Sequence, residues 1–157
     1  MLFFVNYLLI NIIYDNITEG GLMKAVEYFL SGNSCSESTI LGAVDNGWCD
    51  ESLLPVATSF SGGCSSGCMC GAVAGSLMVI GHLFGKNNKY GNPVIARELT
   101  KEFMDKFKEI HKATCCRVLS RGTDAGTPER KRHCSSFVEF CSMTLEEMIK
   151  NAGVKNG

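Results

Sequence analysis

The stretch AVAGSLMVIGHLF, residues 72–84, decides the fold because it is apolar on every side. A helix without a polar face has to be buried, and this one is too short to cross a bilayer. We therefore predict a buried central helix over residues 72–84. Gly71 and Gly75 lie four positions apart at its start, where the lack of side chains allows another backbone to approach closely.

Apolar residues recur at helical spacing before this segment. Residues 23–44 are predicted to form two short helices, or one helix broken at Gly32. Asp50 can cap a third helix over residues 51–60, which Pro55 should keep short. The next segment, SGGCSSGCMCG at residues 61–71, is rich in Gly, Ser and Cys and is predicted to be a tightly folded loop.

Helical spacing resumes after the central segment. The spacing of Ile95, Leu99, Phe103, Phe107 and Ile110 predicts an amphipathic helix. A polar loop over residues 120–126 precedes Thr127-Pro128-Glu129, which is typical of a helix start, and a buried stripe follows at Phe137, Val138, Leu145, Met148 and Ile149. No segment alternates with period two. The prediction is an all-α fold, a compact single-domain bundle of about five to six helices.

Composition limits the possible partners. The 157 residues are 45% hydrophobic and 20% charged, as in an ordinary globular domain. Fifteen Lys and Arg against 16 Asp and Glu give a net charge of -1. Because no basic field attracts phosphate backbones, nucleic acid is not expected as a partner.

Residues 1–22 are expected to be a hydrophobic extension outside the native domain. The apolar run over residues 1–14 is too short for a bilayer span and lacks the flanks of a secretory signal, which leaves a docked helix, a membrane-surface anchor or translated upstream sequence. Glu19-Gly20-Gly21 back-translates to a purine-rich string that resembles a ribosome-binding site before the Met23 codon. We therefore predict a start at Met23, one Cys-rich domain over residues 23–157, and a cytoplasmic protein that meets a membrane only if residues 1–14 are native.

The nine cysteines are the compositional outlier. Cys49 and Cys141 are expected to pack as ordinary thiols, since free cysteine is often buried. The other seven are candidate ligands or redox groups: Cys35, Cys64, Cys68, Cys70, Cys115, Cys116 and Cys134. An odd total without an export signal favours metal binding or catalysis over structural disulfides.

Three of the seven, Cys64, Cys68 and Cys70, lead into the amino end of the central helix. Unpaired N–H groups and the helix dipole stabilise thiolate there, which predicts a low pKa. The spacing Cys-X3-Cys-X-Cys matches neither the zinc-finger pattern nor the ferredoxin run, so it does not identify a metal. Because Cys-X-X-Cys-His is absent, covalent haem is not expected.

These residues resemble the prokaryotic family named for its pattern C_GCAxxG_C_C. Its glycine-containing core matches Cys70-Gly71-Ala72-Val73-Ala74-Gly75, and its first cysteine matches Cys35 after Gly32-Asn33-Ser34. Its third and fourth cysteines match Cys116, followed by Arg117, and Cys134. The family name implies redox activity but no substrate. Cys64, Cys68 and Cys115 depart from the four-cysteine pattern.

The leading hypothesis is an electron-transfer protein or oxidoreductase that binds an iron–sulfur cluster or related metal centre. Its metal ligands are Cys35, Cys70, Cys116 and Cys134, with Cys64, Cys68 or Cys115 as further ligands and Gly71 and Gly75 at the cofactor. The alternatives are a metal-free thiol–disulfide protein, in which Cys70 attacks and Cys116 or Cys68 resolves, and a zinc-stabilised structural module. The expected partners are an unidentified redox protein and, as an alternative, further copies of the same chain in a homo-oligomer.

Four further side chains carry weaker expectations. His82 is expected in the core, and His133 is expected to be an exposed residue at a helix start. Arg117 and Arg132 are candidates for holding anionic sulfur or for facing water.

Overall fold

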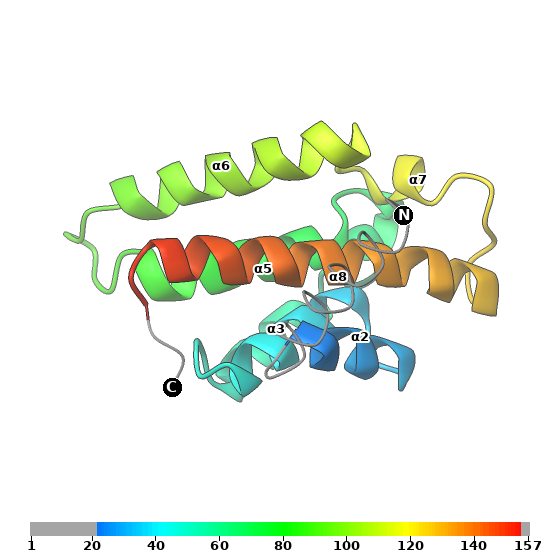
Figure 1. Cartoon of the computed structure of the whole chain (residues 1–157), viewed down its shortest axis with the longest axis horizontal. Helices are drawn as coiled ribbons and strands as arrows, with labels where there is room; N and C mark the ends of the chain where they lie inside the picture. The colour runs from blue at the N-terminus through cyan, green and yellow to red at the C-terminus, as the bar shows by residue number, and fades with distance from the viewer. Residues whose placement is uncertain (1–21, 155–157) are drawn as a thin grey trace, which may run out of the picture.

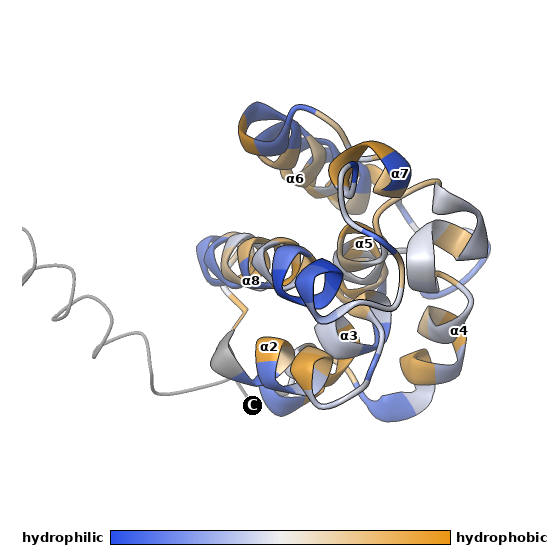
Figure 2. Ribbon diagram, turned by 90° about the vertical axis from the view of Figure 1, so that its right-hand side faces the viewer, coloured by the Kyte–Doolittle hydropathy of each residue, from blue (hydrophilic) through white to orange (hydrophobic). Residues whose placement is uncertain are grey.

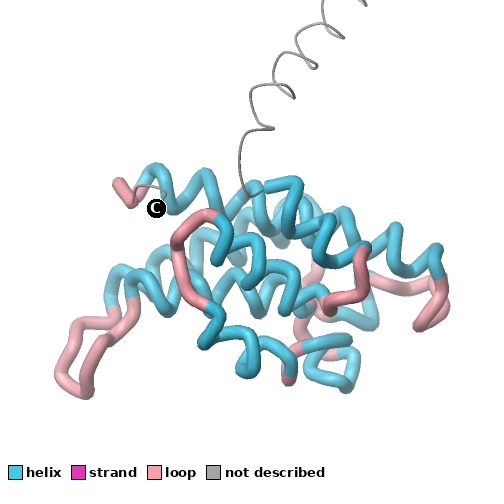
Figure 3. The backbone as a smooth tube through the Cα atoms, turned by 90° about the horizontal axis from the view of Figure 1, so that it is seen from below, coloured by secondary structure: helices cyan, strands magenta, loops and turns pink. Residues whose placement is uncertain are grey.

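The computed structural model describes residues 22–154, and every regular element in that range is a helix (Figures 1 and 3). This confirms the all-α prediction. The extension over residues 1–21 lies outside the described residues. The elements are α2 (Leu22–Leu30), α3 (Cys35–Asp45), η1 (Glu51–Leu53), α4 (Leu54–Thr58), η2 (Gly63–Gly67), α5 (Gly71–Phe84), α6 (Val94–His111), α7 (Cys116–Leu119) and α8 (Pro128–Asn151).

Helix α5 is the central helix. It packs against α3, α6 and α8, and Figure 2 shows it end-on in the middle of the bundle. Val73, Val79 and Ile80 on this helix are almost completely buried. His82 in the last turn of α5 is exposed, whereas Leu83 and Phe84 after it are partly buried against the core, so the predicted place of His82 in the core is wrong.

Helices α3 and α5 lie close together because of two glycines. A Cβ added at Gly71 would collide with Cys35 Sγ and would lie 2.9 Å from the carbonyl oxygen of Phe60. A Cβ added at Gly75 would lie 2.9 Å from the carbonyl oxygen of Ser36. The close backbone approach that the sequence predicted at these glycines is therefore present, and it is α3 that approaches.

Helix α3 begins at Cys35 because Ser34 caps it. The Ser34 hydroxyl accepts from the Glu37 N–H at 3.3 Å, and the Glu37 carboxylate accepts from the Ser34 N–H at 2.8 Å. This reciprocal capping box satisfies two N–H groups that the first turn would otherwise leave unpaired. It also fixes the direction in which the first residue of α3 enters the core.

The two longest helices complete the core. On α6, Phe103 and Phe107 are fully buried, whereas Ile95 and Ile110, near its two ends, are 53% and 60% exposed. Helix α8 begins at Pro128 after the capping residue Thr127, as predicted. The predicted stripe on α8 is buried throughout: Phe137, Val138, Leu145, Met148 and Ile149.

Candidate functional site

Four cysteines from four separate elements line one small cavity of about 20 Å³. Cys35 is the first residue of α3, Cys70 directly precedes α5, Cys116 is the first residue of α7, and Cys134 lies in the second turn of α8. Leu119, Ser120 and Phe137 complete the lining. Of the seven candidate cysteines, the structure thus brings together the four that match the family pattern.

Backbone hydrogen bonds join the Cys-rich loop to the segment before α7. The Cys70 N–H donates to the Thr114 carbonyl at 2.7 Å, the Cys116 N–H donates to the Cys68 carbonyl, and Met69 pairs with Cys115 in an isolated antiparallel bridge. These bonds hold Cys70 and Cys116 side by side, although 45 positions separate them in the chain.

The loop itself is a π-helical turn, Gly63–Gly67, that contains left-handed residues. Gly63 has a φ of 69°, and a Cβ there would lie 2.5 Å from the Cβ of Cys116. Only glycine permits both this backbone conformation and this approach. The glycine content of the loop therefore allows it to fold against the cysteine that begins α7.

Three of the four thiols that line the cavity have raised pKa values. Burial raises the pKa of Cys70 to about 12, and burial also raises the pKa of Cys35 and of Cys134. Backbone N–H groups of Val73 and Ala72 act in the opposite direction on Cys70 but are outweighed. The low pKa predicted for Cys70 at the helix start is therefore wrong, because the desolvation of the thiolate exceeds the stabilisation from the helix end.

Arg130 is the charged residue that the sequence analysis missed. Its Nη2 donates to Cys116 Sγ at 3.8 Å, and its guanidinium lowers the pKa of Cys134 in opposition to burial. Its Nη1 donates to the Thr123 carbonyl at 3.1 Å, and this hydrogen bond orients the guanidinium. The available signal was spacing, since Arg130 precedes Cys134 by one helical turn and lies on the same face of α8.

The two arginines that the sequence suggested, Arg117 and Arg132, do not line the cysteine cavity. Arg117 Nη2 donates to the Ser66 carbonyl at 2.8 Å, so this side chain supports the loop, and Arg132 is exposed. His133 is exposed as predicted, and its Nε2 lies 2.7 Å from the Leu119 carbonyl oxygen.

The remaining candidate cysteines and glycines do not line the cavity. Cys68 is exposed, the Cys115 thiol donates to the Gly67 carbonyl at 3.3 Å, and Cys64 has a left-handed φ of 57° in the loop. Gly71 and Gly75 face α3. Cys141 is fully buried, in agreement with simple packing.

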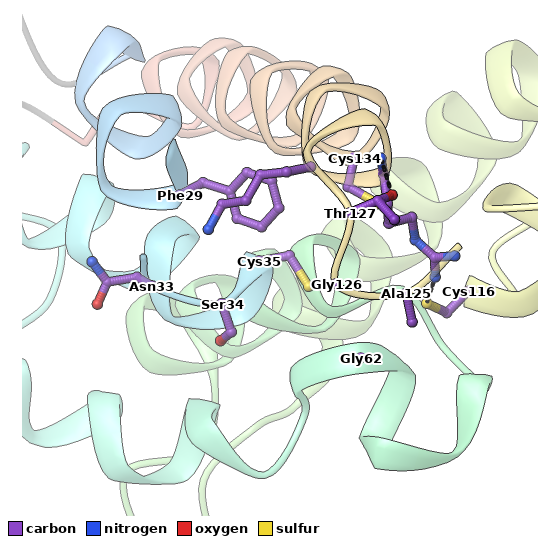
Figure 4. Close-up of a pocket in the computed structure, with 12 residues that line it drawn as sticks. Phe29, Asn33, Ser34, Cys35, Gly62, Cys116, Ala125, Gly126, Thr127 and Cys134 are labelled. Carbon is purple, nitrogen blue, oxygen red and sulfur yellow. Dashed lines mark hydrogen bonds between the residues drawn. The ribbon is translucent and has the colours of Figure 1, made fainter. Parts of the chain in front are cut away.

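A larger pocket of about 420 Å³ adjoins the cavity (Figure 4). Cys35, Cys116 and Cys134 line both spaces, so three of the four thiols are reached from the pocket. Its walls come from the end of α2, the start of α3, the Cys-rich loop and the start of α8.

The donor set suits thiolate-ligated metals, since four cysteines line one cavity whose lining contains no carboxylate. In the described residues, however, no three His, Cys, Asp or Glu side chains are arranged to hold one ion. The four thiols would therefore have to move to close on a metal.

A comparison with known protein families matches residues 33–148 to the family described as "Putative redox-active protein (C_GCAxxG_C_C)". The chain belongs to this family. The match includes all four cysteines of the cavity and Arg130. No curated protein and no solved structure matches the chain. Between residues 22 and 154, no helix combines the length and the hydrophobicity that crossing a membrane requires.

Proposed function

We propose that the four cysteines of the cavity ligate an iron–sulfur cluster and that the protein transfers electrons through it. The observation that carries this proposal is the convergence of Cys35, Cys70, Cys116 and Cys134 on one cavity from four separate elements. Thiolates are the usual ligands of such clusters, and four are sufficient. When bound, the cluster would supply one-electron redox chemistry in a family that is described as redox-active.

The raised pKa values favour metal ligation over simple thiol exchange. A thiol with a pKa of about 12, such as Cys70, holds very little thiolate at neutral pH and is a poor nucleophile. A bound metal deprotonates coordinating thiols outright and replaces the lost hydration of the thiolates with its own charge. Burial therefore works against exchange at Cys70 but is compatible with ligation.

The space around the four cysteines is not confined to the cavity between them. The cavity of about 20 Å³ has room for one water-sized group. A cluster would therefore extend toward the adjoining pocket of about 420 Å³, which three of the four cysteines also line.

The test is anaerobic purification of the full chain, followed by iron and acid-labile sulfide analysis and a visible spectrum. We expect iron, sulfide and visible absorption that bleaches on reduction. Cys134→Ser should lose most of the iron, whereas Cys49→Ser should keep it. The two residues are a matched pair, because burial raises the pKa of both thiols while only Cys134 lines the cavity.

Two results would replace this proposal. A colourless, metal-free protein with a reversible two-electron thiol couple would favour a thiol–disulfide protein. Stoichiometric zinc without a redox signal, together with unfolding on chelation, would favour a structural module.

A further inference from the structure

The pocket beside the cysteine cavity has the size and the electrostatic character of a small-molecule site. Its volume of about 420 Å³ falls within the range of sites that bind small ligands. Of the described residues that line it, only Arg130 and Lys131 are charged, and both are cationic. The lining therefore contains two positive charges and no carboxylate.

Both cations are free of acidic partners in the part of the chain that is described. None of the ion pairs formed within residues 22–154 includes Arg130 or Lys131. Arg130 is held by the Thr123 carbonyl and by Cys116. The Lys131 ammonium lies 4.8 Å from the centre of the Phe29 ring, a cation–π contact that places it at the pocket wall.

The amino ends of two helices also border the pocket. Ser34 and Cys35 at the start of α3, and Thr127 at the start of α8, line it. Each helix carries a glutamate in its first turn, Glu37 or Glu129, which offsets its dipole, so the positive charge of the pocket comes from the two side-chain cations.

The sulfur atoms form the reactive wall of this pocket. Figure 4 shows Cys35 in its middle, with Phe29 on one side and Cys116 on the other. A molecule that fills the pocket would lie against Cys35 and Cys116 while Lys131 and Arg130 face its charge.

We propose that this pocket binds a small anionic molecule, a carboxylate or an oxyanion, as the substrate site of the cysteine centre. The assignment of the ligand as a substrate rests on the proposed redox function. The selection of an anion over a neutral molecule rests only on the pocket and its two cations. A neutral molecule of the same size would lack the attraction to Lys131 and Arg130.

Two alkylating reagents of nearly equal size test this charge selection, namely anionic iodoacetate and neutral iodoacetamide. In reduced, metal-free protein, mass spectrometry of each cysteine gives the ratio of the two rates, and this ratio is independent of the thiolate fraction. We expect the iodoacetate-to-iodoacetamide ratio at Cys35 to exceed the ratio at exposed Cys68 by roughly tenfold, as positive clefts concentrate anions.

A matched pair of variants assigns the effect to the pocket. Lys131→Gln should remove most of the preference at Cys35, whereas Arg132→Gln, with the same loss of charge at the next, exposed position outside this pocket, should leave it within about twofold. Equal ratios at Cys35 and Cys68 in the wild type would overturn the proposal, as would equal losses in both variants. A lack of reaction at Cys35 with either reagent would also overturn it.

The assay separates this proposal from the proposed function. It uses metal-free protein, so its result stands even if no cluster is found. Lys131→Gln should in turn retain the iron and sulfide content of the wild type, because Lys131 does not line the cysteine cavity.

Discussion

Arg130 donates from Nη2 to the sulfur of Cys116 at 3.8 Å and lies one helical turn before Cys134. A single guanidinium therefore acts on two cysteines that lie 18 positions apart in the chain. At Cys134 the guanidinium favours the thiolate form, because the positive charge offsets part of the cost of burying negative sulfur.

Replacing this guanidinium should make the Cys134 thiol less acidic. Arg130→Gln removes the charge that lowers the pKa of Cys134 and leaves burial, which raises that pKa, unopposed. In metal-free protein, the alkylation of Cys134 by iodoacetamide at pH 8 should slow severalfold, with its pH profile displaced upward. Arg130→Lys should restore much of the rate because it keeps the charge. An unchanged profile in Arg130→Gln would show that the guanidinium does not act on this sulfur.

The three cysteines outside the family pattern should be dispensable for the metal centre. Cys64, Cys68 and Cys115 do not line the cavity. The Cys64→Ser, Cys68→Ser and Cys115→Ser variants should each keep at least about four-fifths of the wild-type iron and sulfide. Loss of iron in any of them would make that thiol a ligand and would require the loop to rearrange on metal binding.

Much of the fold could be predicted from the sequence because it depends on local patterns. The apolar run over residues 72–84 and the Thr127-Pro128 start signal directly specified α5 and α8. The prediction for His82 was wrong because tertiary packing, and not the local sequence, determines its exposure. Whether His82 is buried depends on which side of the last turn of α5 packs against the core, and no local pattern contains that information.

The site was only partly predictable for the same reason. The family pattern identified Cys35, Cys70, Cys116 and Cys134, the four cysteines that meet in the structure. Their pKa values and the role of Arg130 depend on burial and on side-chain direction. The position of Cys70 at a helix start predicted a low pKa, but the burial of this thiol raises its pKa instead.

A side chain at Gly71, where α3 packs closely against α5, should destabilise the protein. In Gly71→Ala the new methyl group would meet Cys35 Sγ and the Phe60 carbonyl, so we expect a loss of about 1–3 kcal/mol in the free energy of unfolding, measured in urea. Gly81→Ala is the matched control on the same helix, because a Cβ there meets nothing within 4 Å. It should stabilise the protein by about 0.5–1 kcal/mol, since alanine is the better helix former. Equal effects of the two variants would contradict the close packing of α3 on α5.

The buried thiols should make the reduced, metal-free protein sensitive to alkali. The folded protein raises the pKa of Cys70 from its usual 9.0 to about 12, so above pH 9 the unfolded chain loses this proton while the folded chain retains it. Stability is therefore fully present below about pH 9 and falls as the pH rises toward 12.

Between pH 9 and 11, Cys70→Ser should reduce the slope of the unfolding free energy against pH by up to about 1.4 kcal/mol per unit, because serine does not titrate there. Comparing slopes removes the constant cost of the substitution itself. Parallel profiles for the wild type and Cys70→Ser would mean that the Cys70 thiol ionises as readily in the folded protein as in the unfolded chain.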